Sequence, residues 1–154
     1  MQKAIIIFIF AVILGAGANY FWTNQERKQE TETPIENPTE DLGNAAEKRD
    51  LIRLASPRPN DVVKSPLLLE GEARGTWYFE ASFPVSLYDG NGKLLARAPA
   101  EAQSEWMTEN FVPFKLGLKF DMPGTETGFL VLEKDNPSGE PQFDDELKIP
   151  VKFR

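Results

Sequence analysis

The residues best suited to chemistry in this chain are Trp77, Tyr78 and Phe79, which are followed by Glu80 and preceded by Arg74. Aromatic rings beside a carboxylate and a guanidinium can bind a glycan or a peptide, since aromatic residues and arginine are enriched at interfaces. If the segment is a strand, Trp77 and Phe79 share one face while Tyr78 and Glu80 share the other. A second interpretation places Trp77 or Phe79 in the core, with Glu80 paired to a lysine or capping a loop.

Trp106 is a second candidate for binding. It lies in the polar stretch 101–110, which indicates a loop. A tryptophan on a loop either covers the core or contacts a partner, and the sequence leaves both interpretations open. The candidate binding residues are therefore Arg74, Trp77, Tyr78, Phe79, Glu80 and Trp106, and we expect no catalytic residue.

Acidic residues gather at Asp144, Asp145 and Glu146, near Glu140. Calcium prefers several converging carboxylate oxygens, but the spacing does not match the Asp-x-Asp-x-Asp-Gly calcium loop. A faint match at Asp89-Gly90-Asn91-Gly92 is better explained as a hairpin. We therefore expect neither a metal site nor a cofactor.

The composition argues against several classes of protein. The 154 residues include neither cysteine nor histidine, which removes disulfides, thiolate metal sites and the usual general base. The net charge of −7 argues against a nucleic-acid partner, because phosphate binding needs a basic surface. No Gly-rich phosphate loop occurs. The sequence thus favours a protein that is not an enzyme.

Residues 4–22 carry no charge and predict either a membrane anchor or a signal peptide. As an anchor, they form a helix of about 28 Å, close to the roughly 30 Å hydrocarbon thickness, with Tyr20-Phe21-Trp22 at the interface. As a signal peptide, the segment is cleaved near Ala18. We favour an anchor over residues 1–22, because apolar and aromatic residues continue past the cleavage site. Both interpretations place the rest of the chain outside the cytoplasmic membrane.

Residues 23–50 predict a charged linker. They hold eight acidic and four basic residues, together with Pro34 and Pro38. Such a segment buries too little apolar surface to offset the entropy lost on ordering. A short helix within 42–51 is marginal by itself.

Residues 51–154 predict an all-β domain of about seven strands. The expected strands lie near 51–54, 67–73, 83–88, 93–98, 112–120, 128–134 and 147–153. Where apolar and polar residues alternate, one face of a strand is buried. Pro84 and Pro150 cannot donate to a ladder, so we expect both at an edge or a bulge. Turns at 89–92 and 136–139 complete the pattern of an immunoglobulin-like β-sandwich.

The segment 56–85 resembles the opening of the immunoglobulin-like domain found in bacterial spore germination proteins. The resemblance rests on two Ser-Pro pairs, a Gly-x-Ala step and an aromatic residue before Phe-Glu-Ala; these are Ser56-Pro57, Ser65-Pro66, Gly71-Glu72-Ala73, Trp77 and Phe79-Glu80-Ala81. It covers about residues 51–154. It implies an immunoglobulin-like fold and a role in the cell envelope, with an envelope protein or peptidoglycan as partner.

These features predict a binding or structural module of the bacterial cell envelope, attached by a single-pass helix with its domain on the extracytoplasmic side. The alternative is a small envelope enzyme that acts on glycan, or an inhibitor of a cell-wall hydrolase, because the many acidic residues do not exclude a carboxylate pair. Two carboxylates that converge in a cleft would favour the enzyme, whereas a shallow surface would favour the binding or structural module.

Overall fold

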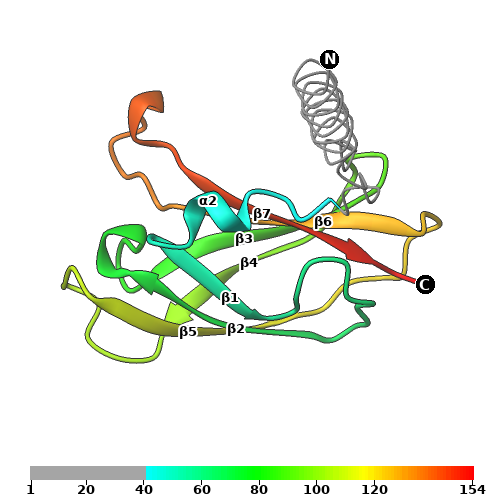
Figure 1. Ribbon diagram of the computed structural model, residues 1–154, viewed down its shortest axis with the longest axis horizontal. Coiled ribbons are helices and arrows are strands. Elements are labelled where there is room, and N and C mark those ends of the chain that lie inside the picture. Colours follow the sequence, from blue (N-terminus) through cyan, green and yellow to red (C-terminus); the bar gives the residue numbers. More distant parts are fainter. Residues whose placement is uncertain (1–40) are drawn as a thin grey trace, which may run out of the picture. The chain divides into compact units, whose positions relative to one another are not determined.

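The computed structural model describes residues 41–154, and Figure 1 shows their arrangement. The strands are β1 (Ile52–Ser56), β2 (Leu67–Arg74), β3 (Ser82–Asp89), β4 (Leu94–Ala102), β5 (Phe111–Leu118), β6 (Thr127–Glu133) and β7 (Glu146–Lys152). One short helix, α2 (Ala45–Lys48), precedes them, and 3₁₀ helices form at Gly75–Trp77 and Pro141–Phe143. All seven predicted strands are present. The predicted anchor and residues 23–40 of the predicted linker lie outside the described residues.

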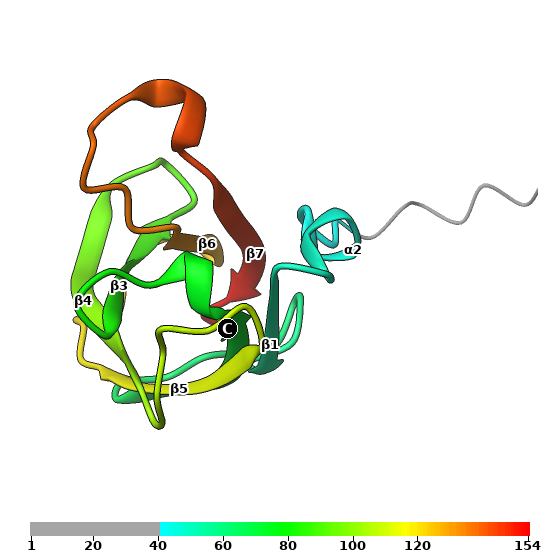
Figure 2. The same cartoon turned by 90° about the vertical axis from the view of Figure 1, so that its left-hand side faces the viewer.

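The seven strands form one antiparallel sheet in the order β1-β2-β5-β4-β3-β6-β7. It folds into two layers, with β1, β2 and β5 facing β4, β3, β6 and β7 (Figure 2). The layers are joined where Glu101 and Ala102 of β4 pair with Lys115 and Phe114 of β5. The predicted all-β, immunoglobulin-like sandwich is therefore confirmed. Within residues 41–154, no helix is long and apolar enough to cross a membrane.

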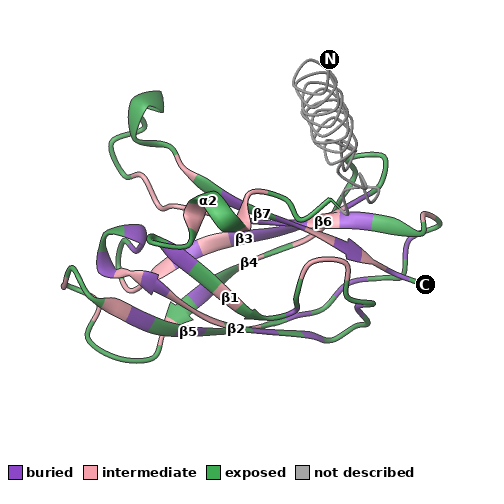
Figure 3. Ribbon diagram, viewed as in Figure 1, coloured by how far each residue is buried: buried purple, intermediate pink, exposed green. Residues whose placement is uncertain are grey.

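The core lies between the two layers, as the burial colours of Figure 3 show. The inward side chains of the last strand and the residue after it are buried, as the alternation predicts: Leu147, Ile149, Val151 and Phe153. On β3, Phe83 stacks edge-to-face against Tyr78 and Phe114, with ring centroids 5.1 and 5.0 Å away. Edge-to-face pairs add to the stability that area burial provides. The three rings link the two layers.

The prolines occupy positions where no ladder hydrogen bond is lost. Pro150 lies on the edge strand β7, as expected. Pro84 lies opposite Pro99 of β4, and neither nitrogen can donate, so the two form a non-hydrogen-bonded pair. The nitrogen of Pro84 therefore faces β6, whose pairing with β3 begins one residue later, at Val85. Pro84 thus lies at the end of the β3–β6 ladder on a central strand, so the expectation of an edge or a bulge is wrong for this residue.

The two predicted turns are both formed. In the β3–β4 hairpin, Asp89 Oδ1 accepts hydrogen bonds from the Asn91 and Lys93 N–H groups, each at 2.9 Å. Gly92 takes the left-handed conformation (φ +79°), whereas Gly90 does not. The hairpin therefore requires glycine at position 92, where the backbone has a positive φ. In the turn at 136–139, the Gly139 N–H donates to the Asn136 carbonyl oxygen (3.2 Å).

The connections gather at two opposite ends of the sandwich. We call 75–81, 103–110 and 134–145 the loop end, where the Gly75 N–H donates to Asn110 O (3.1 Å) and the Asp135 N–H to Trp77 O (3.0 Å). We call 57–66, 90–93 and 119–126 the hairpin end. There, the Phe120 N–H donates to Ser65 Oγ (3.0 Å).

Residues 41–48, which we call the strap, lie along the outer edge of β7. Asn44 binds β7 as a neighbouring strand would: its Nδ2–H donates to Glu146 O (2.9 Å), and the Lys148 N–H donates to Asn44 Oδ1 (2.7 Å). Gly43 (φ +63°) lies so close that a Cβ would sit 1.9 Å from Lys148 O. Lys48 pairs with Asp145. The last ten residues of the predicted linker thus include a segment held on the sheet. The short helix α2 is stabilised by the contacts of Asn44 and Lys48 with β7 and the residue before it.

We expect Gly43→Val to release the strap. The β-branched side chain resists a positive φ and has no space beside Lys148 O. The Lys148 amide, freed from Asn44 Oδ1, then exchanges with solvent deuterium faster than in the wild-type chain. Asn44→Ala removes two hydrogen bonds, and it should lower stability by about 1–2 kcal/mol at the usual net value of each bond.

Ala46→Ser serves as the control for the strap, because Ala46 is exposed on α2. It should leave the exchange of the Lys148 amide unchanged. Equal protection of that amide in Gly43→Val and wild type would show that the strap does not hold β7.

Tyr78 is a titratable residue buried in the core. Its hydroxyl donates to the Val112 carbonyl oxygen at 2.7 Å. Burial is the main cause that holds the pKa of Tyr78 well above its ordinary range, and the charge of Glu72 adds to the rise. In the unfolded chain the phenol ionises near pH 10. Folding therefore favours the protonated phenol.

This difference predicts a loss of stability at alkaline pH. Below about pH 10 the phenol is protonated in both states, so its contribution is complete. Above that pH, only the unfolded state loses the proton, and the free energy of unfolding falls by about 1.4 kcal/mol per pH unit. In urea melts between pH 9 and 11, the Tyr78→Phe variant should not show this fall in the free energy of unfolding. The variant should nevertheless be less stable than the wild-type chain at pH 7. Parallel pH dependence of the two proteins would contradict the assignment.

Candidate functional site

The predicted aromatic cluster is not a strand. Its first part forms the 3₁₀ helix Gly75–Trp77, so Trp77 and Tyr78 are both buried, and the expected alternation of faces is wrong. The reason lies at Gly75, where a Cβ would come within 2.2 Å of the Trp106 and Thr108 carbonyl oxygens. This close approach turns the chain out of β2 and directs two successive rings into the core.

The two halves of the cluster have different environments. Trp77 is 1% exposed, which agrees with the interpretation that places it in the core. Phe79 is 39% exposed, and Glu80 follows it on the surface with φ +49°. Ala81 also has a positive φ (+64°), so the chain turns sharply here before β3. The surface that the cluster offers to a partner is thus limited to Phe79 and Glu80.

Arg74 is engaged by residues outside the aromatic cluster. Its guanidinium carbon lies 4.1 Å from the centre of the Phe111 ring, and the guanidinium carbon of Arg53 lies 4.0 Å from the same centre. The Arg74 side chain also donates to the carbonyl oxygens of Asp50 (3.0 Å) and Glu109 (3.2 Å). Arg74 therefore connects β2 with the segment before β1 and with the β4–β5 loop.

Trp106 lies at the same end of the sandwich as Trp77. It is half-buried and packs against the core, so it covers the core while keeping part of its ring on the surface. The next residue, Met107, is 73% exposed. The structure thus brings the two tryptophan segments predicted from sequence to the loop end, with Phe79 and Met107 as exposed apolar side chains.

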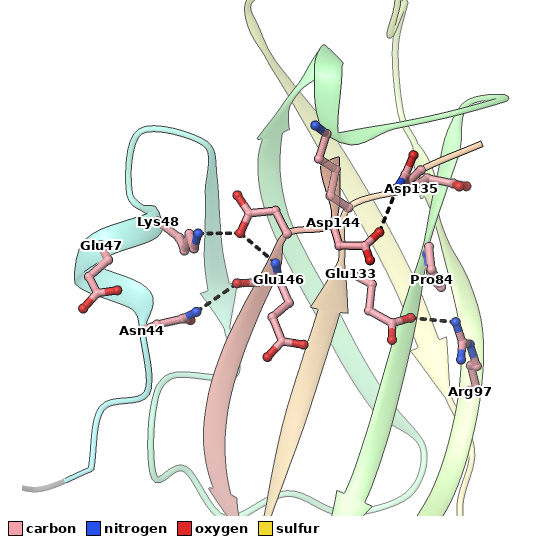
Figure 4. Close-up of a pocket in the computed structure, with 12 residues that line it drawn as sticks. Asn44, Glu47, Lys48, Pro84, Arg97, Glu133, Asp135, Asp144 and Glu146 are labelled. Atoms are coloured by element: carbon pink, nitrogen blue, oxygen red, sulfur yellow. Dashed lines mark hydrogen bonds and ion pairs between the residues drawn. The ribbon is translucent and has the colours of Figure 1, made fainter. Parts of the chain in front are cut away.

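A trough on the outer face of the four-stranded layer was not predicted from sequence. Its first compartment has a volume of about 650 Å³ and lies between the strap, the β6–β7 loop and the outer faces of β3, β4 and β6 (Figure 4). A second compartment of about 550 Å³ continues along β7 toward the hairpin end. Asn44 and Glu146 line both compartments, so the two are adjacent, and we call them together the trough.

The first compartment is acidic. Six acidic and three basic side chains line it, which gives a net charge of −3. Lys48 pairs with Asp145, and Arg97 pairs with Glu133 at 2.6 Å. Most of the remaining carboxylates are exposed to solvent, so this end is open rather than a closed cleft. Within residues 41–154, no group of acidic side chains is arranged to hold a metal ion.

The second compartment has one aromatic ring in its lining, that of Phe129, and Tyr88 contacts this ring without lining the compartment. Tyr88 and Phe129 stack with their centroids 5.2 Å apart, and Lys148 Nζ lies 4.0 Å from the centre of the Phe129 ring. These three residues lie on the outer face of the layer, because their neighbours along each strand are buried in the core. One feature of the sequence indicates that the outer face of this strand is covered. The apolar run at 129–132 does not alternate with polar residues, which is typical of a strand covered on both faces.

The comparison with protein families identifies the domain. A family model described as the immunoglobulin-like domain of bacterial spore germination matches residues 51–140, which include β1 to β6. No curated protein and no solved structure matches the chain. The match covers more than half of the chain, and the seven-stranded sandwich is the fold that its description leads one to expect. The chain therefore belongs to the family of the immunoglobulin-like domain of bacterial spore germination.

Proposed function

We propose that this protein is a binding module of the bacterial cell envelope, tethered to the cytoplasmic membrane by residues 4–22 and displayed on the outer side. Family membership supports a binding or structural role. The uncharged segment 4–22 and the charged segment that follows it support the tether. The partner is another envelope protein or peptidoglycan.

The observation that carries this proposal is the direction in which the chain enters the sandwich. Asp41 lies at the hairpin end, where its carbonyl oxygen accepts a hydrogen bond from Asn60 Nδ2 (3.0 Å). The strap then runs antiparallel to β7 and reaches Asp145 at the loop end. A tether that joins at Asp41 therefore meets the domain at the end opposite to its loops. Loops at the end of a sandwich are a common place for recognition.

The loop end also carries the side chains that suit a contact. Phe79, Met107 and Phe143 belong to three different loops there, and their exposed fractions are 39%, 73% and 50%. The loops themselves are fixed by main-chain hydrogen bonds around Gly75 and Asp135. A recognition surface built on fixed loops loses little entropy on binding.

The first test of the proposed function concerns location. We expect the protein to fractionate with membranes, because 19 uncharged residues suffice to span a bilayer. Protease added to intact spheroplasts should digest residues 51–154. A mature N-terminus at Asn19 would show a cleaved signal peptide instead, and a protein found in the cytosol would overturn the proposed location.

The second test concerns the loop end. Phe79→Ser and Met107→Ser together should reduce binding to purified envelope fragments about fivefold or more, since each anchor at an interface can contribute over 1 kcal/mol. Melting temperature should change little, because both side chains are exposed. The control is Leu68→Ser, which alters an exposed apolar residue (66%) on β2, away from the loop end. Equal binding by the double variant and the control would rule out this surface.

Trp77→Ala completes the comparison of the aromatic residues. Emptying this buried site should cost about 3–5 kcal/mol of stability. Binding per folded molecule should stay at the wild-type level, because Trp77 does not reach the surface.

A further inference from the structure

The two compartments of the trough differ in their chemistry. At the acidic end, the floor consists of Pro84, Glu133 and Glu146. Four residues further along the same strands, Tyr88, Phe129 and Pro150 form a row across β3, β6 and β7. This spacing corresponds to about 13 Å along a strand. A ligand that uses both ends must therefore carry two different groups at that separation.

We propose that the trough binds an extended basic segment of a partner protein. Lysine or arginine side chains of the segment lie at the acidic end, and an apolar side chain about four residues away lies against Pro150 and the edge of the Phe129 ring. The inference rests on the proposed function as a binding module and goes beyond it, because it adds a second contact surface to the loop end and names the chemistry of the partner there.

Charge complementarity selects a basic partner. Lys48 and Arg97 are already engaged by Asp145 and Glu133. The carboxylates that remain at the acidic end belong to Glu47, Asp135, Asp144 and Glu146, and the remaining cation is Lys134. A segment bearing two positive charges would compensate most of this excess. Complementary charges of this kind speed association and select partners.

The floor also fixes the direction of the segment. Lys148 holds its ammonium over the Phe129 ring, so a second cation is repelled from the second compartment. The apolar group of the partner must therefore lie toward the hairpin end and its cations toward the loop end. Between the two ends lies Ser86, whose buried Oγ has no hydrogen-bond partner among residues 41–154.

The partner binds to the face of the layer and not to its β7 edge. Asn44 satisfies Lys148 N–H and Glu146 O, and the Asn60 N–H donates to Pro150 O at 2.7 Å. Further along, the Val63 N–H donates to Lys152 O (2.8 Å). Strand addition at this edge would have to displace the strap and the β1–β2 loop. Binding through side chains on the face leaves these bonds intact.

The probe for this inference is a fluorescein-labelled synthetic peptide with two lysines, then three serines, then phenylalanine and leucine. Fluorescence anisotropy measures its binding to the full chain in a non-ionic detergent. We expect binding that weakens as salt rises from 50 to 300 mM. Replacing the lysines by glutamates should abolish it, and replacing the phenylalanine and leucine by serines should weaken it severalfold.

The protein variants locate the binding site. Glu47→Lys with Glu146→Lys should reduce the affinity for the probe about tenfold or more, because the acidic end then carries a net positive charge. Asp121→Lys is the control, and combined with Glu126→Lys it matches the charge change of the double variant, since Asp121 and Glu126 are exposed at the hairpin end outside the trough. Carbodiimide coupling of probe lysines to carboxylates should yield cross-links at Glu47, Asp144 or Glu146 by mass spectrometry.

Three results would overturn the inference: equal binding of the lysine and glutamate probes, equal affinity of the double variant and its charge-matched control, or cross-links confined to other faces. Displacement of the probe by chitotetraose, with no effect of the charge variants, would indicate a glycan site and would also overturn it. The measurement uses purified protein and does not depend on where the protein resides. A cytosolic location would thus contradict the proposed function alone, whereas absence of probe binding would contradict this inference alone.

Discussion

The structure depends on satisfying the backbone groups along the open edge of β7. A sandwich whose sheet does not close leaves a row of unpaired N–H and C=O groups, which invites pairing with other chains. Here, Asn44 supplies a side-chain amide with one donor and one acceptor, and the β1–β2 loop supplies the next main-chain partners. Pro150 has no N–H to satisfy. These elements together occupy the edge and hold the strap in place.

The occupied edge determines what the domain can offer to a partner. Its loops are fixed at one end, and its outer face is bordered by the strap on one side and the β6–β7 loop on the other. Without the strap, the acidic compartment would lose the wall that contains Glu47 and Lys48. The acidic compartment therefore depends on a segment of eight residues that has no buried helix face of its own.

Much of the fold could be predicted from the sequence, because alternation and turn chemistry act locally. The burial of Ile149 and Phe153 and the hairpin at Asp89 follow from period two and from residues that accept positive φ. The aromatic cluster could not be predicted in the same way. Trp77 and Tyr78 lie in a strand-like pattern, but the contact of Gly75 with a loop some thirty residues later converts it into a 3₁₀ turn.

The trough was missed for a related reason. Its walls come from the segment around Asn44 and from the loop before Glu146, which are about a hundred residues apart in the chain. Patterns within one strand do not reveal which distant segment will lie beside it. The continuous apolar run at 129–132 indicated that the outer face of β6 was partly covered, but it could not identify the strap as the cover.

The direction of the strap has a mechanical consequence. Asp41 lies at one end of the strap and Lys48, paired with Asp145, at the other. A force that pulls on the linker while a partner holds the loop end acts along the strap, parallel to β7. The hydrogen bonds of Asn44 and the Lys48 ion pair are then loaded together, in shear. A linker leaving from the loop end would instead peel these contacts apart one by one, so the same bonds resist tension better in the geometry that the chain adopts.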